Sequence, residues 1–187
     1  MPSDTLSVCE EKFVTSLRNN TAFPEKLQAL SEAYQALESI AVEQKAQQLL
    51  TTHNCPMQEV IGQATQEAMA SFNDPDAHRE HIYALFRLYQ AVNAFADADA
   101  SGLVMYDLAA MTAFKDQPEV LERYESALKH LKTCADALLS ESKELYGLAG
   151  DYIQELSEEE CRHPNQRAVG DASEQAVTPR RKSSARK

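Results

Sequence analysis

Two pairs of neighbouring side chains have the types that nucleophilic or metal chemistry requires. Cys55 follows His53 by two residues at a break between helical segments, where a helix N-terminus would activate its thiol. His78 and His81 stand three residues apart near a helix start and could hold two positions on a metal ion if a third ligand came from elsewhere. Neither pair is accompanied by a G-x-S-x-G, H-E-x-x-H or glycine-rich phosphate motif. An enzyme that uses Cys55 and His53 is therefore an alternative only, and we interpret the histidine pair as an exposed, partly charged first turn.

A third pattern supplies oxygen ligands. Asp97, Asp99 and Ser101 precede Gly102 with the spacing of the first half of an EF-hand calcium loop, and the stretch resembles such a loop over about eight residues. It departs at the last position, where Leu108 replaces the bidentate Glu, and no second loop is present. Asp97, Asp99 and Ser101 are therefore weak candidates for metal ligands. The other interpretations are a helix-loop-helix junction and an uninterrupted helix, and we favour the helix because the apolar spacing resumes beyond the glycine.

The clearest signal of an element that could position these residues lies between Pro118 and Glu160. There, residues of one stripe recur at alternating intervals of three and four, which predicts a long helix that packs lengthwise against other helices. Only one member of the stripe, Ser142, is polar. The stripe consists of Leu121, Tyr124, Leu128, Leu131, Ala135, Leu138, Ser142, Leu145, Ala149, Tyr152 and Leu156.

The rest of the chain repeats this helical pattern in shorter pieces. We expect a helix over 24–52 with Leu27, Leu30, Tyr34, Leu37 and Ala41 inward, a break near 53–56, and a resumed helix to 72. A second long helix follows the Asn73-Asp74-Pro75 cap signature and turns at 115–118 into the last helix. A short helix near 4–19 precedes them all. The sequence therefore predicts an all-α, elongated antiparallel bundle of three long helices, one kinked or broken near 53–56, with coiled-coil-like packing.

Charge divides the chain into two predicted regions. Residues 1–161 carry 11 Lys and Arg against 27 Asp and Glu, a formal charge of −16, whereas residues 162–187 carry 7 against 2, a charge of +5. We expect a folded helical domain over 1–161 and a disordered basic tail over 162–187. The acidic body argues against nucleic-acid and anionic-membrane surfaces on the folded part. The tail could contact acidic surfaces, and Thr178–Ser184 resembles protein-kinase substrates.

Location and cofactors are predicted from features that the sequence lacks. It has four cysteines without a C-x-x-C pair, no signal peptide and no apolar run of membrane-spanning length. We therefore expect a cytoplasmic protein without a cofactor. The acidic run Glu158–Glu160 ahead of the tail resembles export signals of secreted bacterial effectors, so non-classical secretion into a host stays open.

These observations favour a non-catalytic protein–protein interaction or scaffolding module, an adaptor or a secreted bacterial effector. Its helix faces would contact a protein partner or a second copy of the chain. Residues that lie partly off the main stripes could anchor that contact, namely Tyr83, Phe86, Arg87 and Tyr106. A calcium-responsive or membrane-associated helical bundle is the alternative in the same fold class.

Overall fold

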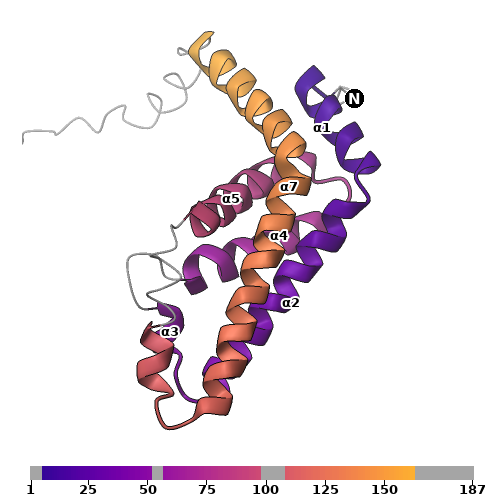
Figure 1. Cartoon of the computed structure of the whole chain (residues 1–187). Coiled ribbons are helices and arrows are strands. Elements are labelled where there is room, and N and C mark those ends of the chain that lie inside the picture. The colour runs from indigo at the N-terminus through magenta and orange to yellow at the C-terminus, as the bar shows by residue number, and fades with distance from the viewer. Residues whose placement is uncertain (1–5, 52–56, 98–107, 163–187) are drawn as a thin grey trace, which may run out of the picture. The chain divides into compact units, whose positions relative to one another are not determined.

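The computed structural model describes residues 6–51, 57–97 and 108–162 (Figure 1). Within these ranges the chain is almost entirely helical and contains no strand, so the predicted all-α class is confirmed. The chain forms two units, Met1–Tyr152 and Ile153–Lys187. In the second unit the described residues are the last turns of the C-terminal helix. Of the predicted disordered tail over 162–187, Arg162 is the last residue of that helix, and residues 163–187 lie outside the described ranges.

The helices follow the order predicted from the sequence, with extra breaks. They are α1 (Val8–Asn19), α2 (Ala22–Glu43), α3 (Gln48–Thr51), the π-helical turn η1 (Gln58–Gly62), α4 (Gln63–Phe72), α5 (His78–Asp97), a helical stretch over 108–113, and α7 (Pro118–Arg162). α4 packs against α2 and α5, and α1 contacts α5. η1 contacts α2, α3 and α5.

Helix α7 confirms the stripe that the sequence predicts. All nine of its positions from Tyr124 to Tyr152 are buried. The one polar member, Ser142, is 2% exposed, and its hydroxyl donates to the carbonyl oxygen of Leu138 at 2.6 Å. That bond satisfies the hydroxyl inside the helix, so a serine is tolerated in an apolar stripe.

Helices α2 and α7 lie side by side and run in opposite directions (Figure 1). At one end the amide of Asn20, just ahead of α2, donates to the carbonyl oxygen of Glu141 at 3.1 Å. At the other end the guanidinium of Arg123 lies 3.5 Å from the carboxylate of Glu43. Because low numbers on one helix meet high numbers on the other, the pair is antiparallel.

The predicted helix over 24–52 is wrong at its C-terminal end. Its inward residues from Leu27 to Ala41 are buried as expected, but α2 ends at Glu43 and a separate turn, α3, follows. Lys45 adopts a left-handed φ of 54°. The backbone N–H of Lys45 donates to the carbonyl of Val42 at 3.1 Å, and that of Ala46 donates to the carbonyl of Ala41 at 2.7 Å. These two bonds form a Schellman motif, which caps the helix and turns the chain.

The second predicted long helix is described in two parts. α5 begins at His78, after the predicted cap signature, and reaches Asp97; residues 98–107 lie outside the description, and the chain is helical again over 108–113. The uninterrupted helix through 97–102 therefore stays a prediction. The predicted turn ahead of Pro118 is confirmed. The rings of Phe114 and Tyr124 pack across it with their centroids 5.8 Å apart.

Candidate functional site

The residues predicted to carry chemistry fall mostly outside the described ranges. This applies to Asp99 and Ser101, to the side chain of Asp97 at the end of α5, and to the pair of His53 and Cys55. The calcium loop and the cysteine–histidine site therefore stay predictions. Among the described residues, no three His, Cys, Asp or Glu side chains gather closely enough to hold a metal ion.

The histidine pair is described, and its interpretation as an exposed first turn is wrong for His81. That residue is only 3% exposed. Its Nε2 lies 2.6 Å from the carbonyl oxygen of Asp74 and 3.0 Å from that of Ser71. Both partners are acceptors, so Nε2 carries a hydrogen. The imidazole therefore ties the turn between α4 and α5 to the first turn of α5.

Aromatic rings surround this imidazole. Phe72 stacks on His81 at a centroid distance of 4.7 Å, and His78 meets His81 edge-on at 5.9 Å. Phe23 of α2 contacts Phe72 in a T-shaped arrangement at 5.3 Å. These rings line one side of a cavity of about 430 Å³ that α1, Leu27 and Met69 also border.

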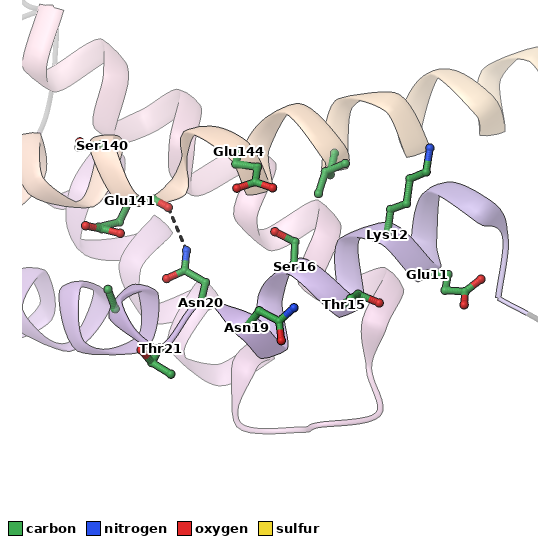
Figure 2. A pocket seen from close by; sticks show the side chains of 12 residues that line it. Glu11, Lys12, Thr15, Ser16, Asn19, Asn20, Thr21, Ser140, Glu141 and Glu144 are labelled. Atoms are coloured by element: carbon green, nitrogen blue, oxygen red, sulfur yellow. Dashed lines mark hydrogen bonds between the residues drawn. The ribbon is translucent and has the colours of Figure 1, made fainter.

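A second hollow, of about 880 Å³, lies between α1 and α7. Figure 2 shows Lys12 and Ser16 of α1 and Glu144 of α7 extending into it, and Asn20 bonded to the backbone of Glu141. The oxygen of the Asn20 amide also accepts from the backbone N–H of Phe23 at 3.0 Å, so one side chain joins the start of α2 to α7. The lining is mainly polar, which is typical of a solvated groove, whereas ligand pockets are mostly apolar.

Two of the residues predicted to anchor a partner, Phe86 and Arg87, contact other residues of the same chain. Phe86 stacks on Tyr146 of α7 at 5.2 Å, and Tyr89 stacks on the same ring at 3.9 Å. Arg87 lies 3.4 Å from the carboxylate of Glu67. Tyr83 is 40% exposed and remains available. Tyr106 lies outside the described residues.

Other large apolar side chains are exposed instead, among them Val42 of α2 and two residues of the helical stretch ahead of α7. Leu108 and Met111 are each 51% exposed and are separated by one helical turn. They precede Phe114, which contacts Tyr124 of α7. Val42 of α2, also 51% exposed, is adjacent to Glu43, the partner of Arg123 in α7. We call Val42, Leu108 and Met111 the exposed end residues.

One cysteine–histidine pair was missed in the sequence. The Sγ of Cys134 lies 3.7 Å from Nε2 of His130, one turn earlier in α7. Burial raises the pKa of the Cys134 thiol, and the charge of Lys26 lowers it in part. A thiol whose pKa is raised by burial is a weaker nucleophile near neutral pH. The i,i+4 spacing was the available signal.

Comparison with known proteins gives no relative from which a function could be transferred. No family model matches the chain, no curated protein is similar to it, and no solved structure matches its fold. A search of the described helices for one of sufficient length and hydropathy to cross a bilayer finds none. The fold therefore defines the class of protein, an all-α protein, and function has to be argued from its surface.

Proposed function

We propose that this protein is a non-catalytic protein–protein interaction module built on antiparallel, coiled-coil-like helix packing, and that it works in the cytoplasm. The observation that carries the proposal is the exposure of Leu108 and Met111, which lie one turn apart on one helical stretch and are each half exposed. Neighbouring apolar side chains that are exposed on a folded protein are typical of docking surfaces. The stripe of α7 cannot serve this purpose, because it is buried within the chain.

The chemistry of the partner follows from the surface. Leu108 and Met111 stand three positions apart on one helical stretch, the spacing with which a helix presents neighbouring apolar side chains to a groove or to another helix. The chain over 1–161 as a whole has a strong excess of acidic residues. A protein segment with apolar side chains and flanking basic residues fits both features, and opposite charge would speed its association. Self-association is the second form of the same proposal.

The test compares two substitutions that add the same charge to the same helical stretch. Met111→Glu places a carboxylate among the exposed end residues. Ala113→Glu places one at an exposed position about 160° around the helix from Met111. Purified protein, with and without residues 162–187, is used to recover partners from lysate of the native host, and its mass in solution is measured by light scattering.

We expect Met111→Glu to reduce recovery of the partner, or of a dimer, at least tenfold, while Ala113→Glu behaves as the wild type. Circular dichroism checks that both variants retain the helical content. Equal recovery by all three proteins would contradict the proposal. Recovery that depends only on residues 162–187 would assign the interaction to the tail.

A further inference from the structure

The pair of His130 and Cys134 stands on α7 at the boundary between the core and solvent. The two residues are four positions apart, so their side chains project from one face of the helix, one turn from each other. His130 is exposed, whereas Cys134 is 8% exposed. Both belong to the first unit. An ion would therefore approach the sulfur along the imidazole, from the solvent side.

The distance between the two side chains matches that between two ligands of one metal ion. The Sγ of Cys134 lies 3.7 Å from Nε2 of His130. In tetrahedral zinc sites the bonds to sulfur and to imidazole nitrogen are about 2.3 Å and about 2.0 Å long, which places the two ligand atoms about 3.6 Å apart. A zinc ion bound to both atoms would thus need little change in their separation.

The chemistry of the pair also suits zinc, which binds neutral imidazole and thiolate. The thiol must first lose its proton to solvent, so that a metal–sulfur bond replaces the S–H bond. Burial raises the pKa of Cys134 and opposes that loss, whereas the charge of Lys26 lowers the pKa in part. Among the described residues, no third His, Cys, Asp or Glu side chain is close enough to complete the ligand set. The site is therefore open, and water would fill its other positions.

We propose that His130 and Cys134 form an open, two-ligand site on α7 for zinc or another divalent cation that prefers sulfur and nitrogen ligands. Magnesium and calcium prefer oxygen ligands, so they would not bind there. The site thus differs from the predicted calcium loop in its place, its ligands and its ions. It is also independent of the proposed protein–protein interaction, because it uses none of the exposed end residues.

The test uses cadmium, a soft substitute for zinc whose bond to a thiolate absorbs in the ultraviolet. In the full-length protein, Cys9, Cys55 and Cys161 are replaced by serine, so that this absorption reports Cys134 alone. We expect the absorption to rise with added cadmium and to saturate at one ion per chain. Zinc should compete for the site, and magnesium should not. The proposal is overturned if millimolar cadmium gives no thiolate absorption.

Variants at position 130 test the second ligand. His130→Gln changes an exposed side chain and should weaken cadmium binding at least tenfold. Adding Thr133→His to this variant restores the number of histidines but turns the ring about 100° around the helix from Cys134, so binding should stay weak. His130→Cys supplies a soft ligand at the original position and should restore binding. Circular dichroism checks that each variant retains the helical content. Equally tight binding by His130→Gln would show that the imidazole is no ligand and sink the proposal.

Discussion

Helix α7 buries nine stripe positions, from Tyr124 to Tyr152, at regular heptad spacing, whereas the contact between α2 and η1 includes one pair of residues that fits too closely for any side chain larger than glycine. There the ring of Tyr34 lies against Gly62, and a Cβ atom at position 62 would come within 2.6 Å of the Tyr34 Cζ. In α7 each residue makes one of many similar contacts. At the α2–η1 contact, only glycine leaves room for the ring.

The two regions also differ in the hydrogen bonding of one buried hydroxyl group in each. In α7 the buried hydroxyl of Ser142 is bonded to its own helix. At the α2–η1 contact the hydroxyl of Tyr34 is buried without a hydrogen-bond partner in the described residues. Burial, and secondarily the charge of Glu38, raises the pKa of Tyr34 to about 12. The irregular contact thus holds an ionisable hydroxyl whose charged form is disfavoured by burial.

The largest effect is expected from shortening a side chain in the regular region. Leu131 is fully buried in α7. Leu131→Ala should lower the free energy of unfolding by about 2–5 kcal/mol, because it removes buried apolar surface and leaves a cavity. Urea unfolding followed by circular dichroism measures the change.

The control lies two residues further along the same helix. Thr133 is exposed, so Thr133→Ala should change the free energy of unfolding by no more than about 0.5 kcal/mol. If Leu131→Ala proved as mild as Thr133→Ala, the stripe would not be the core of the first unit.

This contrast explains how much of the fold the sequence could predict. The buried face of α7 can be predicted from that segment alone, because its apolar residues recur every 3.5 positions whatever the helix packs against. The end of α2 at Glu43 cannot be predicted in this way. The residue with the left-handed conformation there is Lys45, and lysine does not indicate a helix end as glycine would. Gly62 was visible in the sequence, but nothing local shows which ring packs against it.

The candidate site was predictable to a smaller extent. The sequence singles out His78 and His81 by type and spacing, yet it predicts an exposed first turn. His81 is buried with its Nε2 bonded to two backbone carbonyls, those of Ser71 and Asp74, which the turn brings close to it. Every residue has a backbone carbonyl, so the sequence does not indicate which carbonyls will lie close to His81. Only the three-dimensional structure shows this. The cap signature at Asn73-Asp74-Pro75 was the one local hint of that turn.

The next effect concerns the ionisable group at the irregular contact. The pKa of Tyr34 is raised from 10.0 to about 12 in the fold, so the neutral phenol stabilises the native state below pH 10 relative to higher pH. That stability should be lost as the pH rises from about 10 to about 12, by up to roughly 2–3 kcal/mol.

Tyr34→Phe isolates this contribution from other groups that titrate in alkali. The variant should be about as stable as the wild type at pH 8, because it removes a hydroxyl that has no partner in the described structure. Above pH 10 it should lose less stability than the wild type. Parallel stability profiles of the two proteins between pH 8 and pH 12 would show that Tyr34 ionises as freely as an exposed tyrosine.

Gly62→Ala tests whether the contact is as specific as its geometry indicates. The added methyl group would overlap the ring of Tyr34, and relief of such overpacking costs about 1–3 kcal/mol. In a Tyr34→Ala background the overlap is gone. There, Gly62→Ala should become neutral or stabilising by up to about 1 kcal/mol, because alanine favours helix more than glycine does. Additive effects in this double-mutant cycle would mean that the two residues are not in contact.

The smallest expected effect is a gain in stability at the break that the sequence did not predict. Lys45 is exposed and holds a φ of 54°, a conformation that costs a residue with a Cβ roughly 1–2 kcal/mol. Lys45→Gly removes this cost but loses more entropy on folding, so a net gain of about 0.5–1 kcal/mol is expected. Gln44→Gly is the matched control: its φ of −88° suits any residue, so glycine there should only destabilise. The sign of the difference between the two neighbouring glycine variants, measured by urea unfolding, is decisive. If both destabilise the protein equally, the chain does not turn at Lys45, and α2 runs on toward residue 52 as the apolar pattern alone predicts.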